Sequence, residues 1–170
     1  MKMNQHLSQI RTLALGSLLA VLVAGCNSSG SHETPAAAAP STNAAAESAV
    51  AWLTDYPQAL KVAAEQKKPV LLDFTGSDWC PPCKQLKRTV FDTDEFARYA
   101  RERLVLVELD FPRSKQQPSE LAAQNQRLQK QYAIEGYPTL ILLSPEGKEI
   151  KRTVGFMDGG PKAFIQWAGL

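Results

Sequence analysis

The segment 77-SDWCPPCKQLK-87 constrains the fold of this chain more than any other feature, because it places two cysteines and two prolines ahead of a helix-forming run. Proline has no backbone N–H group and is tolerated only in the first turn of a helix, where that group would have no helical partner. Pro81 and Pro82 therefore predict that a helix begins directly after Cys80. Cys83 then lies about one turn into this helix, beneath the first sulfur.

Hydrophobic patterning from residue 49 onward predicts helices that alternate with buried strands. Short apolar runs bounded by Pro, Gly or polar residues predict strands at 70–74, 104–109, 139–143 and 148–154. Amphipathic or capped segments predict helices near 57–68, 80–90, 92–103, 119–132 and 161–167. We expect an α/β domain with a central mixed sheet of about four or five strands flanked by helices, parallel in its early part and hairpin-like in its late part.

Residues 1–25 have the pattern of an export signal and not of a folded element. A basic start precedes an apolar run over 13–23, which is shorter than the about 20 residues that span a bilayer. The run ends in 23-VAGC-26, which resembles the lipobox of bacterial lipoproteins. That resemblance implies removal of the signal and acylation of Cys26. The alternative is an ordinary signal peptide with a cysteine at this position by chance.

Residues 26–48 are expected to form a lipidated cysteine and a flexible tether, and residues 49–170 a single globular domain. The segment after Cys26 is rich in Ala, Ser and Pro and lacks aromatic residues, Val, Ile and Leu up to residue 48, so it cannot bury enough surface to offset its ordering entropy. We expect a lipid-anchored protein of the cell envelope. In a Gram-negative cell, Asn27 in place of Asp favours the periplasmic face of the outer membrane.

The charge of the processed chain argues against nucleic-acid binding. The full sequence has 19 Lys and Arg residues and 17 Asp and Glu residues. Lys2 and Arg11 lie in the signal, and no acidic residue does, so the processed chain is close to neutral. It lacks the clustered positive charge that nucleic-acid binding needs.

Three roles are open to the cysteine pair. A zinc site needs four ligands, but residues 49–170 contain two cysteines and no histidine, so two-coordinate Cu(I) is the metal option that remains. A purely structural disulfide across a two-residue loop would restrict the unfolded chain very little. A redox pair has a physical mechanism, because the positive end of the helix dipole stabilises a thiolate at the first cysteine. The second cysteine can then resolve a mixed disulfide.

Several segments of the chain resemble the thioredoxin superfamily. The matching segments are 70-VLLDF-74, 79-WCPPCK-84 and 137-YPT-139, the last just before a predicted strand. Two further segments, 74-FTGSDWC-80 and 110-DFP-112, are similar to the exported bacterial thioredoxin-like group. The resemblance covers about residues 52–167 and implies a thioredoxin-like fold.

The resemblance also implies roles for individual residues. Cys80 would be the attacking thiol and Cys83 the resolving one, and their redox-active disulfide would make any other cofactor unnecessary. Trp79 would shield the pair. Tyr137 would offer backbone hydrogen bonds to an extended substrate segment, and Pro138, after a cis peptide bond, would press against the disulfide.

Asp73 would be the buried carboxylate that helps Cys83 lose its proton. Two departures from the thioredoxin pattern bear on this role. Asp73 lies seven residues before Cys80, where thioredoxin has a spacing of six, and Glu108 stands where thioredoxin has a buried lysine. A second carboxylate there would raise the proton affinity of Asp73. The alternative is a strand-end residue that makes a local hydrogen bond.

The Pro-Pro spacer favours a reductase of protein disulfides. It offers the thiolate no side-chain donor and no N–H group, so we expect a thiolate pKa closer to about 7 than to the ~3.5 of strong oxidants. The reduction potential should lie nearer about −270 mV than about −120 mV. The expected partners are protein disulfides and a DsbD-type membrane protein as electron donor, with a monomer as the default state. The alternatives are a disulfide isomerase or oxidase on the same site, and a non-enzymatic Cu(I)-binding or interaction module.

Overall fold

The computed structural model describes residues 50–170. The predicted signal, the tether and Cys26 lie outside these residues. The strands are β1 (Trp52–Leu53), β2 (Val70–Thr75), β3 (Val105–Asp110), β4 (Thr139–Leu143) and β5 (Glu149–Val154). The helices are α2 (Tyr56–Gln66), α3 (Pro81–Leu86), the π-helical η1 (Lys87–Phe91), α4 (Asp94–Arg103), α5 (Ser119–Gln131) and α6 (Gly160–Ala168). Within this part of the chain, no helix is long and apolar enough to cross a membrane.

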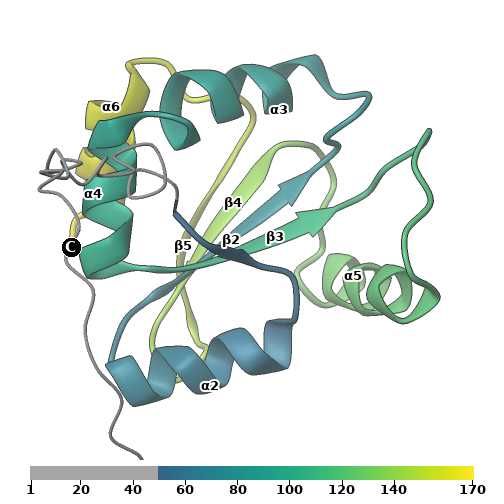
Figure 1. Ribbon diagram of the computed structural model, residues 1–170, viewed down its shortest axis with the longest axis horizontal. Coiled ribbons are helices and arrows are strands. Elements are labelled where there is room, and N and C mark those ends of the chain that lie inside the picture. The colour runs from purple at the N-terminus through teal and green to yellow at the C-terminus, as the bar shows by residue number, and fades with distance from the viewer. Residues whose placement is uncertain (1–49) are drawn as a thin grey trace, which may run out of the picture. The chain divides into compact units, whose positions relative to one another are not determined.

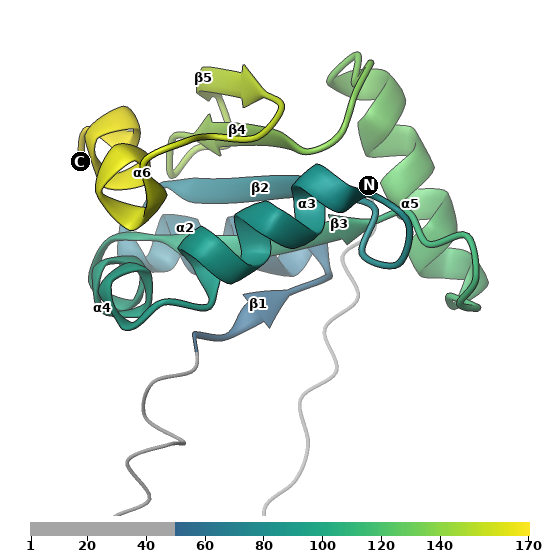
Figure 2. The same cartoon turned by 90° about the horizontal axis from the view of Figure 1, so that it is seen from above.

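The five strands form one mixed sheet in the order β1-β3-β2-β4-β5 (Figure 1). β1 and β2 run parallel to β3, whereas β4 is antiparallel to both β2 and β5. Helices α2 and α5 cover one face of the sheet, and α3, η1, α4 and α6 cover the other (Figures 1 and 2). The prediction of a mixed α/β sheet, parallel early and hairpin-like late, is confirmed.

Strand β2 lies at the centre of the sheet and is buried along its whole length. Successive side chains of a strand point to opposite faces. Val70, Leu72 and Phe74 accordingly pack under α2 and α5, while Leu71 packs under the helices of the other face. Asp73 is two residues after Leu71, so its side chain points to the same face of the sheet, the one that carries α3.

Capping residues define the starts of two helices. Cys80 is the N-cap of α3, which begins at Pro81 as the spacer predicts. Thr93 is the N-cap of α4, and its side-chain oxygen accepts a hydrogen bond from the backbone N of Phe96.

Two elements differ from the prediction. The helix expected over 80–90 widens into η1 after Leu86, and this wider turn buries both Val90 and Phe91. Strand β1 was not predicted, because two residues are too few to show a strand period. Strand β1 is defined by its parallel pairing with β3, in which Trp52 lies opposite Leu106.

Candidate active site

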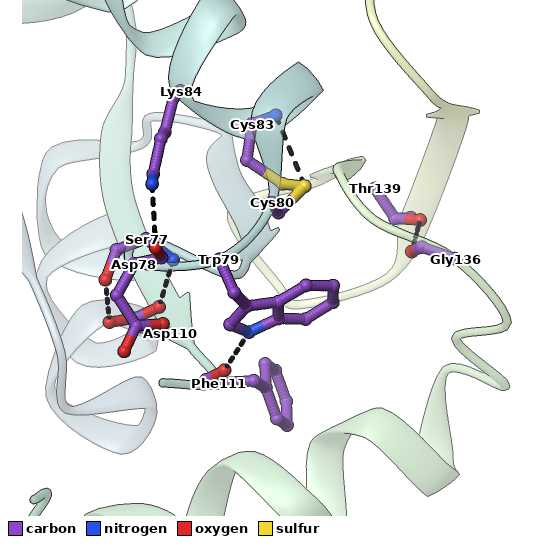
Figure 3. The surroundings of a disulfide bond; sticks show 10 residues. All are labelled: Ser77, Asp78, Trp79, Cys80, Cys83, Lys84, Asp110, Phe111, Gly136 and Thr139. Carbon is purple, nitrogen blue, oxygen red and sulfur yellow. Dashed lines mark hydrogen bonds between the residues drawn. A yellow bond between two sulfur atoms is a disulfide. The ribbon is translucent and has the colours of Figure 1, made fainter. Parts of the chain in front are cut away.

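The two cysteines form a disulfide at the N-terminus of α3 (Figure 3). Their Cα atoms are 5.3 Å apart. The backbone N–H of Cys83 donates to Sγ of Cys80 across 3.3 Å. An N–H group in this position favours negative charge on the sulfur that it faces.

Both cysteines are almost completely buried, with exposed fractions of 2% for Cys80 and 4% for Cys83. Little of either cysteine is therefore open to solvent. In residues 50–170, no group of three or more His, Cys, Asp or Glu side chains is arranged to hold a metal ion.

Trp79 is fixed in place beside the disulfide (Figure 3). Its indole Nε1 donates to the backbone oxygen of Phe111 across 2.7 Å. A side chain at Gly76 would prevent this position, because its Cβ would lie 2.5 Å from Cε2 of the indole. The indole also meets the ring of Tyr137 edge-on, with ring centroids 5.6 Å apart. These contacts suit the predicted shielding role of Trp79.

The loop between β2 and α3 is tied to the end of β3 and to the loop that follows it. Asp110 accepts hydrogen bonds from the backbone N and the hydroxyl of Ser77, at 2.8 and 2.6 Å. The carboxylate of Asp78 accepts from the backbone N atoms of Arg113 and Ser114. The hydrogen bond from Ser114 is the main reason that the pKa of Asp78 is lowered.

Asp73 lies beneath the disulfide, in a cavity of about 40 Å³ that Cys83, Lys87 and Glu108 also line. Its Oδ1 atom is buried and has no hydrogen-bond partner in the part of the chain that the structure describes. Burial, and after it the negative charges of Glu108 and Asp110, raise the pKa of Asp73 to about 8. This carboxyl is therefore protonated over much of the neutral range.

Glu108 pairs in register with Asp73 across β2 and β3, so both side chains lie on the same face of the sheet. Burial, followed by the charge of Asp110, also raises the pKa of Glu108. The sequence predicts that Glu108 raises the proton affinity of Asp73, and the geometry agrees with this. The positive charge of Lys87 opposes the effect at both carboxyls.

The Tyr137–Pro138 peptide bond is cis, as the resemblance implies. Pro138 is buried, and its backbone oxygen accepts a hydrogen bond from the backbone N of Gly155. The hydroxyl of Thr139 donates to the backbone oxygen of Gly136 across 2.8 Å, which closes the turn that Figure 3 shows beside the disulfide. The structure thus brings Trp79, the cysteine pair and this turn together.

Sequence reasoning did not identify Ser77, Asp110 or Arg113 as parts of the site. The segment 110-DFP-112 signalled a family similarity, but the contacts of Asp110 depend on which strand ends meet. Parallel pairing of β2 with β3 places the ends of both strands at the same edge of the sheet, where Thr75 lies opposite Asp110.

Comparison with known proteins gives one family match over most of the described residues. Residues 56–168 match the family described as a thioredoxin-like domain. Disulfide bond reductase DsbH of Chlamydia pneumoniae is 39% identical over 110 residues, which are 65% of this chain and 66% of that protein. Thioredoxin-related protein DsbJ of the same organism is 34% identical over 107 residues, which are 63% of this chain and 31% of that protein. The match thus spans slightly less than two thirds of the first relative and about a third of the second.

Solved structures show the same fold. A structure of DsbH oxidoreductase superposes with a TM-score of 0.67 at 34% identity, covering 81% of this chain and 91% of the other. A thioredoxin from Thermus thermophilus superposes with a TM-score of 0.53 at 22% identity, covering 72% of this chain and 85% of the other. The second match bears on the fold alone.

Proposed function

Because this chain belongs to the thioredoxin-like family, we propose that it reduces protein disulfides by dithiol–disulfide exchange at Cys80 and Cys83. The observation that carries the proposal is the position of the pair. Cys80 caps a helix, and the N–H of Cys83 is directed at its sulfur. This arrangement favours a thiolate at the first cysteine and keeps the second within bonding distance of it.

The exchange proceeds in two steps, starting from the reduced pair. The Cys80 thiolate attacks one sulfur of the substrate disulfide, the substrate S–S bond breaks, and the leaving sulfur takes up a proton. Cys83 then loses its proton and attacks the Cys80 sulfur of the mixed disulfide, which closes the Cys80–Cys83 bond and releases the second substrate thiol. Two electrons pass from the pair to the substrate; of the two protons on the product thiols, one comes from Cys83 and the other from solvent.

We assign the uptake of the proton from Cys83 to the ionised form of Asp73, which is the minor form at neutral pH and becomes more abundant as pH rises toward 8. Both residues line the same small cavity. A pKa of about 8 for Asp73 lies close to that of a thiol, about 8.5, so the proton can move between them at little free-energy cost. Glu108 supports this role by holding the proton affinity of Asp73 high.

Substrate contact is assigned to Trp79, Tyr137 and Pro138. Trp79 and Tyr137 pack against each other beside the disulfide, which gives an apolar surface for a polypeptide segment. Extended segments bind through backbone hydrogen bonds, which the backbone of Tyr137 would supply.

The direction of electron flow is proposed from the spacer and the relatives. Pro81 and Pro82 supply neither an N–H group nor a side-chain donor to the thiolate, which disfavours the strongly oxidising extreme. The name of DsbH, a disulfide bond reductase, supports the same direction. The oxidised pair must then be reduced again by an external dithiol, for which we propose a DsbD-type membrane protein.

The midpoint potential tests this direction. Equilibration of residues 49–170 with dithiothreitol or glutathione buffers should give a value nearer about −270 mV than about −120 mV. The reduced fragment should also precipitate insulin by cleaving its interchain disulfides. A potential near −120 mV would instead support the oxidase or isomerase alternative. Tight Cu(I) binding without insulin reduction would support the non-enzymatic module.

We also propose that acylation of Cys26 anchors the processed chain to a membrane of the cell envelope. The 23-VAGC-26 match and the following polar tether support this placement. Multiple acyl chains give stable anchoring, whereas a single chain binds only marginally.

A labelling experiment tests the anchor. The full chain expressed in a Gram-negative host should incorporate radioactive palmitate and partition into the detergent phase of Triton X-114. Cys26→Ser should remove both properties while leaving insulin reduction intact, because Cys80 and Cys83 remain. Equal partitioning of the two proteins into the aqueous phase would contradict the anchor.

A further inference from the structure

The guanidinium group of Arg113 lies over the ring of Trp79, with its central carbon 3.6 Å from the ring centroid. Arg113 is exposed. Its guanidinium forms no ion pair with any of residues 50–170, in which the two salt bridges are Lys87–Asp92 and Arg152–Glu149. A guanidinium that stacks on an aromatic face leaves its N–H edge free to bind a planar acceptor. The Arg113 guanidinium therefore places a positive charge and five N–H donors next to Trp79, the residue that precedes Cys80.

Arg113 is held in this position from two directions. Its backbone N donates to the carboxylate of Asp78 at 3.1 Å, and the neighbouring N of Ser114 donates to the same carboxylate at 2.6 Å. The ring beneath the guanidinium is itself fixed, because Nε1 of Trp79 donates to the backbone oxygen of Phe111. The carboxylate of Asp78 accepts hydrogen bonds from backbone N–H groups and forms no ion pair with the guanidinium of Arg113.

Arg113 lies close to the surface formed by Trp79 and Tyr137, to which we assign substrate contact. Trp79 contacts Tyr137 edge-on, and Tyr137 precedes the cis Pro138. Burial raises the pKa of the Tyr137 hydroxyl, while a hydrogen bond with Gln129 and the positive charge of Arg113 oppose that rise. Arg113 and Tyr137 both contact Trp79 and are close enough to each other to interact electrostatically.

We propose that Arg113 is a specificity-determining residue that binds a carboxylate of the substrate close to its disulfide, so that the protein prefers acidic polypeptide segments. This inference rests on the proposed reductase function. A guanidinium binds a carboxylate through two parallel N–H···O bonds, which a lysine cannot reproduce. If Arg113 only held Trp79 in place, its replacement would lower kcat/KM equally for all disulfide substrates.

Two matched substrates separate these roles. Each is a pair of short peptides joined by one disulfide, with Glu beside the cysteines in the first substrate and Gln in the second. The reduced full-length chain, purified in detergent, should show a higher kcat/KM for the Glu substrate at low salt. Arg113→Gln should lower kcat/KM for the Glu substrate about three- to fivefold, the size expected for one exposed ion pair, and leave the Gln substrate within about twofold. The preference should weaken as ionic strength rises.

Two further variants complete the test. Arg113→Lys should retain only part of the preference, because it keeps the charge and loses the planar fork. Arg98→Gln is the matched control: this exposed arginine lies on α4, at the opposite end of the fold from the loop between β3 and α5 (Figures 1 and 2). It should leave both substrates unchanged.

Three outcomes would overturn the inference and leave the proposed function intact. Equal slowing of both substrates by Arg113→Gln would mean that Arg113 only positions Trp79. An equal loss in Arg98→Gln would mean that general charge, and not this site, sets the preference. Equal rates for both substrates in the wild type would remove the preference itself. Failure of the wild type to reduce either substrate or the small neutral 2-hydroxyethyl disulfide would reject the proposed function, and this inference with it.

Discussion

Replacing Cys80 with serine is expected to lower the rate of protein-disulfide reduction by at least about 10³-fold. A serine hydroxyl neither ionises at neutral pH nor forms a stable bond to sulfur, so the first attack cannot occur. Cys83→Ser should behave differently, because the attacking thiolate remains and only the resolving step is lost. Insulin reduction measures the rate, and non-reducing gels show whether mixed disulfides accumulate.

The pair of variants distinguishes the roles of the two cysteines. Each removes one thiol from the same buried site, so their effects on stability should be similar, and circular dichroism shows whether both are folded. Cys83→Ser should trap substrate proteins through Cys80, and mass spectrometry identifies them. If Cys80→Ser traps adducts and Cys83→Ser does not, the assigned roles are exchanged. If Cys80→Ser retains full activity, exchange at this site is not the reaction.

The chemistry of the site could be predicted from short segments, because its main parts are local in the sequence. The two prolines place the helix start at Cys80, and this position alone directs the N–H of Cys83 at the first sulfur. The order of helices and strands follows from hydrophobic runs for the same reason. Where a pattern extends over five or more residues, as in β2 or α4, the predicted and observed bounds differ by no more than about two residues.

The parts of the site that could not be predicted depend on contacts between distant segments. Ser77 meets Asp110, and Trp79 meets Phe111 and Arg113, only because β2 and β3 end side by side. Residues 111–118 have the composition of a polar loop and carry no period that would place them against Trp79. The environment of a strand residue is non-local too, since Asp73 lies opposite Glu108 through the register of the sheet.

The second large effect is expected at Asp73, and it concerns stability. The pKa of this carboxyl is about 8 in the folded protein, raised by burial and by Glu108 and Asp110, whereas an unfolded aspartate has a pKa of about 3.9. Between these values the folded state binds more protons than the unfolded state, so the free energy of unfolding falls as pH rises from about 4 to about 8. Asparagine does not ionise, so the free energy of unfolding of Asp73→Asn should not fall in this way. Above pH 8 the variant should be more stable than the wild type by about 3–5 kcal/mol, and near pH 4 the two should be similar.

Urea unfolding of the oxidised proteins at pH 4.5, 6, 7 and 8.5 measures this difference. Asp78→Asn is the matched control, because Asp78 is only partly buried and hydrogen bonds from the backbone lower its pKa. That carboxylate stabilises the fold when charged, so its replacement should reduce stability above pH 4, the opposite sign to Asp73→Asn. The gain at Asp73 should come with slower resolution by Cys83, seen as mixed disulfides that persist longer, since the proton acceptor is gone. Equal stability of wild type and Asp73→Asn at pH 8.5 would show that Asp73 ionises without cost, and a carboxyl of that kind could not hold the proton that Cys83 must release.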